Sequence, residues 1–123
     1  MRSLRILPLL SLLFFLSGCG KDDFAPLVAQ PLTIAVFKGG RPVSERHLSP
    51  PSCEHDRLAA WLSQHQSGWH TSYATFAPGV LVRGTNLTLN IQHSEVIINT
   101  GGRQLARDAE DADFQFLLQA PGT

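Results

Sequence analysis

Lysine is scarce in this 123-residue chain, which contains only Lys21 and Lys38. Ten basic residues are balanced by ten acidic ones, and the arginines are scattered rather than clustered. A nucleic-acid surface requires clustered Lys and Arg, so we expect no nucleic-acid partner. The sequence also lacks internal repeats and low-complexity tracts. Its length therefore predicts one ordinary folded domain.

Recognisable catalytic and metal motifs are absent as well. The five histidines form no His-x-x-x-His pair and no His-Glu-x-x-His motif; they are His47, His55, His65, His70 and His93. His55 and His65 share the helix predicted at residues 52–66 but lie nearly three turns apart, which is too far for both to bind one ion. Cys53 and His55 are near neighbours on that helix and point apart. We expect no catalytic residue, no metal and no cofactor, and a small periplasmic enzyme using Cys53 or a histidine is the alternative.

An acidic cluster near the C-terminus consists of Asp108, Glu110, Asp111 and Asp113. It lacks the glycine and the closing glutamate of an EF-hand loop. We interpret it as a solvated segment whose charge discourages pairing at a strand edge, with weak calcium binding as the alternative.

The N-terminal segment has the organisation of a secretory signal peptide. Arg2 and Arg5 precede residues 6–16, which are apolar apart from one proline and one serine. About 11 residues cannot span a bilayer core, which needs roughly 20. Small residues then lead to a cysteine in the sequence Leu16-Ser17-Gly18-Cys19. A basic head, a short apolar run and small residues before a cleavage point predict export.

This tetrapeptide resembles the lipobox of bacterial lipoproteins. The resemblance implies cleavage before Cys19, a diacylglyceryl group on its thiol and a further acyl chain such as palmitate on its amine. Several chains together hold a protein on a membrane stably, whereas one chain does so only marginally. Gly20 follows the cysteine, and in this class that favours the periplasmic face of the outer membrane.

Four segments follow from this interpretation. Residues 1–18 are a cleaved signal peptide, 19–31 a lipidated N-terminus with a flexible tether, 32–119 a globular domain and 120–123 a frayed end. Loss of Arg2 and Arg5 leaves eight basic and ten acidic residues, so the mature protein is slightly acidic. Lipid on Cys19 leaves Cys53 without an internal partner. We interpret Cys53 as a small buried side chain, with a reactive thiol or pairing to another chain as alternatives.

Residues 52–66 carry the clearest helix signal. Ser52 is a suitable N-cap, and Gly68 follows the predicted end. One apolar stripe consists of Leu58, Trp61, Leu62 and His65. Its spacing predicts that one side of the helix is buried.

Strand signals surround this helix. We expect strands at residues 32–37, 80–82, 87–92, 95–100 and 114–118 from their composition or period of two. Residues 69–76 are ambiguous but favour an extended conformation, 41–51 predict a polar loop, and 103–113 predict a loop or short helix. These elements together predict an α+β domain, with one amphipathic helix packed on a mostly antiparallel sheet of about four to five strands.

Trp69 and Tyr73 are the candidate partner-binding residues, because Trp and Tyr are enriched at interface hot spots. Core packing is the alternative for this aromatic segment. Together these inferences predict a non-enzymatic binding or accessory domain, lipid-anchored to the membrane, with an envelope protein as its partner. A structural lipoprotein that links envelope layers is the alternative, and the sequence predicts no oligomeric state.

Overall fold

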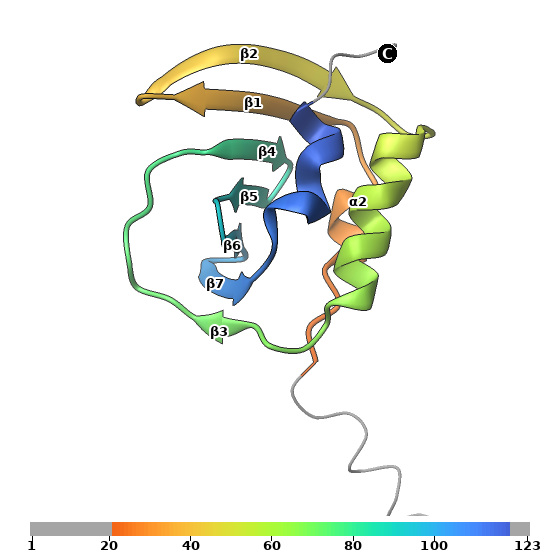
Figure 1. Cartoon of the computed structure of the whole chain (residues 1–123). Helices are drawn as coiled ribbons and strands as arrows, with labels where there is room; N and C mark the ends of the chain where they lie inside the picture. Colours follow the sequence, from red (N-terminus) through yellow and green to blue (C-terminus); the bar gives the residue numbers. More distant parts are fainter. Residues whose placement is uncertain (1–20, 119–123) are drawn as a thin grey trace, which may run out of the picture.

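A computed structural model describes residues 21–118 and shows one antiparallel sheet with helices on one face (Figure 1). The strands are β1 (Leu32–Lys38), β2 (Arg41–Leu48), β3 (His70–Thr71), β4 (Val80–Gly84), β5 (Leu87–Ile91), β6 (Glu95–Thr100) and β7 (Arg103–Asp108). Their order across the sheet is β2-β1-β4-β5-β6-β7-β3. The helices are the 3-10 helix η1 (Ala25–Val28), the α-helix α2 (Cys53–Gln64) and the 3-10 helix η2 (Asp111–Leu118).

The expected α+β domain with four to five strands is wrong, because the domain is mostly β and its sheet has seven strands. The polar segment expected as a loop forms the edge strand β2, which pairs only with β1. Most of its side chains are exposed on both faces, so the strand carries no alternating apolar signal. The charged segment 103–108 is likewise a strand, β7, rather than a loop or helix.

The last predicted strand, residues 114–118, is also wrong, because these residues lie in the 3-10 helix η2. Phe114, Phe116 and Leu117 are buried, whereas Leu118 is half exposed. Phe114 and Leu117 are three residues apart, which places them on one face of a helix with three residues per turn. The apparent period of two in this segment was therefore misleading.

The predicted helix is present as α2, two residues shorter at its C-terminal end. The Ser52 side chain accepts a hydrogen bond from the backbone N–H of His55 at 3.1 Å, which satisfies one free donor of the first turn. Three of the four expected stripe residues are buried; they are Leu58, Trp61 and Leu62. His55 is buried as well, which the pattern did not predict.

The main core lies between the sheet and the three helices. One apolar row crosses five adjacent strands and consists of Ile34, Val82, Leu89, Ile98 and Leu105, each opposite the next in the register. All five belong to the cluster that includes Leu58 and Leu62 of α2. Burial of a large aliphatic side chain contributes roughly 1.5–3 kcal/mol, so this row is a principal source of stability.

The opposite face of the sheet is covered by residues 72–79, which we call the crossing segment. β3 lies at one edge beside β7, whereas β4 lies between β1 and β5, so the connecting chain must pass back across three strands. In Figure 1 this segment runs on the side of the sheet away from α2. Ile97 and Ala106 alternate with the core row and are nevertheless buried. The sheet is therefore covered on both faces.

The packed structure begins earlier in the chain than the sequence suggested. Phe24 and Val28, which fall in the expected tether 19–31, are buried members of the main core. The backbone N–H of Asp22 donates to the carbonyl of Gln66 at 2.6 Å. The part of the expected tether from Asp22 onward therefore belongs to the folded domain. Within residues 21–118, no helix combines the length and hydrophobicity needed to cross a membrane.

We predict that Phe24→Ala lowers the free energy of unfolding by about 3–5 kcal/mol, the usual effect of removing a buried phenylalanine ring. Its ring packs edge-on to Trp69, with centroids 5.1 Å apart. Urea titration followed by tryptophan fluorescence measures the change. Lys21→Ala, at an exposed position three residues earlier, is the control and should change stability little. Equal stability of both variants would contradict the packing of this segment.

Candidate functional site

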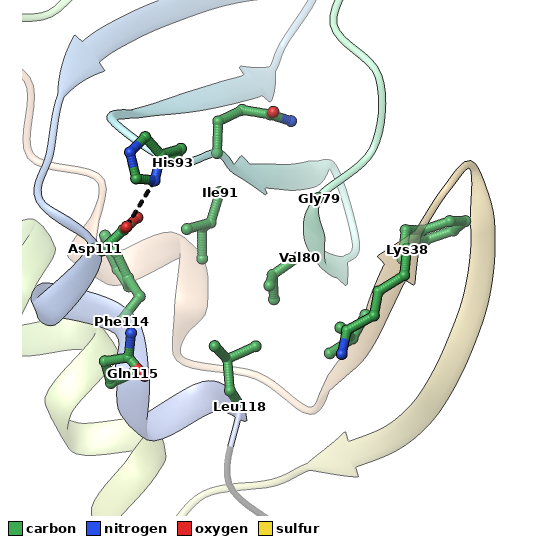
Figure 2. A pocket seen from close by; sticks show the side chains of 12 residues that line it. Lys38, Gly79, Val80, Ile91, His93, Asp111, Phe114, Gln115 and Leu118 are labelled. Carbon is green, nitrogen blue, oxygen red and sulfur yellow. Dashed lines mark ion pairs between the residues drawn. The ribbon is translucent and has the colours of Figure 1, made fainter.

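A pocket of about 300 Å³ lies at one end of the sheet, between η2 and the β1–β2 hairpin (Figure 2). Its walls are mainly apolar and include Val36, Val80, Ile91, Phe114 and Leu118. Small-molecule sites in proteins are mostly apolar cavities of roughly 300–1,000 Å³ with a few polar groups. This pocket lies at the small end of that range and suits one apolar group or short chain.

Charged side chains lie on two sides of the pocket. On one side, Nδ1 of His93 lies 2.6 Å from Oδ2 of Asp111. Both side chains are well exposed, at 88% and 48%, so the pair adds little to stability. On the other side, Figure 2 shows Lys38 extending from the hairpin toward Leu118. Lys38 takes part in none of the ion pairs found among residues 21–118. The pocket therefore combines apolar walls with one cation that has no acidic partner there.

Gly79, at the end of the crossing segment, gives one wall of the pocket its shape. A Cβ atom at this position would lie 2.5 Å from the carbonyl oxygen of Ile91, so only glycine fits without a shift of the backbone. The carbonyl of Gly79 accepts a hydrogen bond from the N–H of Phe37 at 2.9 Å. Its N–H donates to Oδ1 of Asn90 at 3.0 Å. These contacts fix the segment against β1 and β5 just before β4 begins.

Three amide side chains hold the crossing segment. Nδ2 of Asn90 donates to the carbonyl of Ala77 at 3.1 Å, and Nε2 of Gln92 donates to the same carbonyl. Nε2 of Gln104 donates to the carbonyls of Ser72 and Ala74 at 3.1 and 2.8 Å. The segment has no strand partner over most of its length, so these side chains satisfy backbone groups that a sheet would otherwise pair.

The residues that line this pocket offer groups suited to binding a ligand. An Asp–His pair acts in nucleophilic catalysis when the imidazole also contacts a hydroxyl or thiol. Among residues 21–118, no such group is hydrogen-bonded to His93, and Cys53 is not among the residues that line the pocket. Apolar walls and an unpaired lysine instead favour a ligand with an apolar part and a negative charge.

The structure places Trp69 and Tyr73 in different surroundings. Trp69 is half buried, packs against the core, and donates from Nε1 to the carbonyl of His65 at 2.7 Å. Tyr73 lies in the crossing segment with 94% of its surface exposed. Neither residue lines the pocket of Figure 2. Trp69 has a packing role, and Tyr73 is the member of the pair that a partner can reach.

Cys53 is exposed at the first position of α2, so the expectation that it is buried is wrong. His55 and Leu58 lie on the buried side of the helix. Cys53 lies on the side that faces solvent. Cys19, the expected site of lipid attachment, lies outside the residues that the structure describes.

Among residues 21–118, the pair of His93 and Asp111 is the one ion pair between a histidine and an acidic residue. Nδ1 of His65 lies 2.7 Å from the carbonyl of Trp61, and the two rings stack. Oδ2 of Asp113 accepts from Nε1 of Trp61 at 3.1 Å, whereas Asp111 faces His93. In the described part of the chain, no three His, Cys, Asp or Glu side chains are placed to share a metal ion. The acidic segment therefore has packing roles that its composition did not reveal.

Sequence reasoning missed the pocket and its charged residues. Lys38 follows the predicted strand 32–37, and His93 lies between the predicted strands 87–92 and 95–100. Their proximity depends on β1, β5 and η2 meeting at one end of the sheet. No pattern within any one of these segments carries that information.

Comparisons with known proteins give no relative to guide the assignment: no family model, no curated protein and no solved structure matches this chain.

We predict that Asn90→Ala lowers the free energy of unfolding by about 1–3 kcal/mol, because it removes the acceptor of the Gly79 N–H and one of the two donors to the Ala77 carbonyl. Asn99→Ala is the matched control, since Asn99 is an exposed asparagine two residues along β6 from Ile97. Chemical denaturation of both variants measures the difference. If the two substitutions had the same effect, Asn90 would not hold the crossing segment.

Proposed function

We propose that this chain is a lipid-anchored protein of the bacterial cell envelope and that its folded domain is a non-enzymatic binding domain. The location rests on the signal segment and on the resemblance of Leu16-Ser17-Gly18-Cys19 to a lipobox. A cleaved leader of this kind acts in targeting and forms no part of the fold. The anchor is lipid on Cys19, at the periplasmic face of the outer membrane.

The observation that carries the binding role is the pocket between η2 and the β1–β2 hairpin. It offers apolar walls and the lone cation of Lys38, together with no activated nucleophile among the described residues. Such a site binds an apolar group next to a negative charge, and we propose this chemistry for its ligand. A group of this kind can belong to a free amphiphile or to a side-chain pair of an envelope protein.

Replacement of the anchoring cysteine tests the location. In Cys19→Ser, the thiol that receives lipid is absent, so we expect an unprocessed precursor with no incorporation of labelled palmitate. Gel mobility and palmitate labelling in the bacterial host measure both effects. Cys53→Ser is the control and should be processed and labelled normally. Persistent labelling of the Cys19→Ser protein would refute the anchor.

Short amphiphiles of equal length test the ligand chemistry. We expect octanoate to bind more tightly than octanol and to shift the methyl NMR signals of Val80, Ile91 and Leu118, measured on the mature chain made without lipid. Lys38→Glu should reverse the preference toward octylammonium. An exposed charge pair contributes at most about 1 kcal/mol, so the change is roughly two- to fivefold in affinity.

Val43→Glu is the control for this experiment, because Val43 is an exposed apolar residue of β2 that does not line the pocket. Leu118→Glu places a like charge at the pocket and should weaken octanoate binding. Photo-crosslinking from position 118 in intact cells then distinguishes a protein occupant from a free amphiphile. Equal binding of all three amphiphiles to the native and Lys38→Glu chains would argue against the proposed role of Lys38.

A further inference from the structure

Asp22, the second described residue, contacts the end of the sheet opposite the pocket through its side chain. There the β4–β5 turn meets the β6–β7 turn: Oγ1 of Thr100 donates to the carbonyl of Asn86 at 2.8 Å, and the N–H of Gly101 donates to Oδ1 of Asn86 at 3.1 Å. Nη2 of Arg103 lies 3.6 Å from Oδ1 of Asp22. We call these two turns and the residues that flank them, 83–86 and 100–103, the proximal end of the sheet.

The chain that joins Cys19 to this end is very short. Asp22 is fixed through its backbone to Gln66 and lies beside Arg103. A fully extended chain covers at most about 3.6 Å per residue, so the three steps from Cys19 to Asp22 span no more than about 11 Å. A tether of a dozen residues would allow about 20 Å of root-mean-square separation. Lipid on Cys19 therefore keeps the proximal end close to the headgroups.

Charge is distributed unequally between the two ends. The proximal end has three cations, Arg83, Arg103 and the nearby Lys21, against the two carboxylates of residues 22–23, and Asp22 contacts Arg103. The opposite, distal end carries five carboxylates against the three cations Lys38, Arg41 and Arg107, and the carboxylates are Glu95, Asp108, Glu110, Asp111 and Asp113. The ends of β6 and β7 are linked there, since the N–H of Ala109 donates to the carbonyl of Ser94 at 3.0 Å.

The strands hold the charges of the proximal and distal ends farther apart than the distance over which the electric field of a membrane surface decays. Strands of five or six residues span roughly 17–20 Å, whereas the field of a charged surface decays over about 8–10 Å at physiological salt. An anionic membrane beneath the proximal end therefore attracts its arginines and lies beyond the reach of the distal carboxylates. The reverse orientation would bring five carboxylates and only three cations toward the lipid.

We propose that the proximal end rests on anionic phospholipid headgroups through Arg83 and Arg103, with Lys21 beside the anchor, so that the pocket opens away from the membrane. The proposal depends on the lipid anchor at Cys19 proposed above. It identifies the partner of this surface as a phospholipid bilayer with negative headgroups. The surface fixes how the domain is oriented, and the lipid fixes where it is held.

Site-specific probes test this orientation in the complete lipoprotein, purified and reconstituted into phosphatidylcholine vesicles with or without phosphatidylglycerol. Thr85→Cys and Ser94→Cys each carry a bimane label in a Cys53→Ser background, because both positions are exposed, one at each end of the sheet. The vesicles contain a lipid with a nitroxide headgroup. We expect severalfold stronger quenching at position 85 than at position 94, and a larger contrast with phosphatidylglycerol present.

Arg83→Gln combined with Arg103→Gln should reduce the quenching at position 85 on anionic vesicles to its value on neutral vesicles. Arg41→Gln, at the tip of the β1–β2 hairpin, removes the same charge elsewhere and should leave the quenching unchanged. Equal quenching at positions 85 and 94 would overturn the orientation. A difference in quenching between the two positions that is the same with and without phosphatidylglycerol would also overturn it.

Mass spectrometry of the Cys19 peptide in the same preparation separates the two ways of failing. A lipidated peptide with equal quenching overturns the orientation alone. An unmodified Cys19 in protein recovered from the bacterial membrane overturns the anchor and the orientation together.

Discussion

Coverage of both faces of one broad sheet is the constraint on which the rest of this structure depends. Seven antiparallel strands present two surfaces, and an exposed apolar sheet face or long edge is a site of aggregation. The helices cover the face that carries Ile98, and the crossing segment covers the face that carries Ile97. At the edge, β2 has Pro42 and mostly exposed polar side chains, which discourage pairing with another chain.

The two coverings differ in kind, and that difference explains the buried polar groups. A helix satisfies its own backbone, so α2 packs on the sheet mainly through apolar side chains, with one ion pair between Glu54 and Arg46 of β2. The crossing segment has no internal ladder, and its carbonyls depend on amide side chains from the strands below. Asn90 is therefore buried at a position where the neighbouring strands supply Leu81 and Ile97. The pocket forms where these two coverings meet, between Gly79 on one side and Phe114 on the other.

The sequence allowed prediction of those elements whose burial is one-sided and local. The stripe of α2 and the alternation of Leu87, Leu89 and Ile91 record burial against a single layer, and both elements are present. β2 escaped prediction because an edge strand with two exposed faces has no apolar period. In β7 only Leu105 and Ala106 are buried, and they are adjacent, so no alternation is visible there.

The candidate site was beyond prediction for a different reason. Lys38 ends β1, His93 follows β5 and Asp111 begins η2, and these three residues meet only through the order of the strands. Cys53 was misplaced because a free cysteine usually behaves as a small buried side chain, whereas the direction of the apolar stripe of α2 leaves this position exposed. The burial of single residues was thus predicted well where the local period of the sequence determines it. It was predicted poorly where the topology of the sheet determines it.

Strand length has a consequence for access to the pocket. The strands between the proximal end and the pocket are five or six residues long, which corresponds to roughly 17–20 Å. With the anchoring and orientation proposed here, the pocket opens about that far above the lipid, beyond the depth of the headgroup layer. An acyl chain still embedded in the bilayer cannot enter it. The ligand must arrive through the aqueous phase or on a protein that reaches this height. The membrane that holds the domain therefore does not supply the ligand by lateral diffusion.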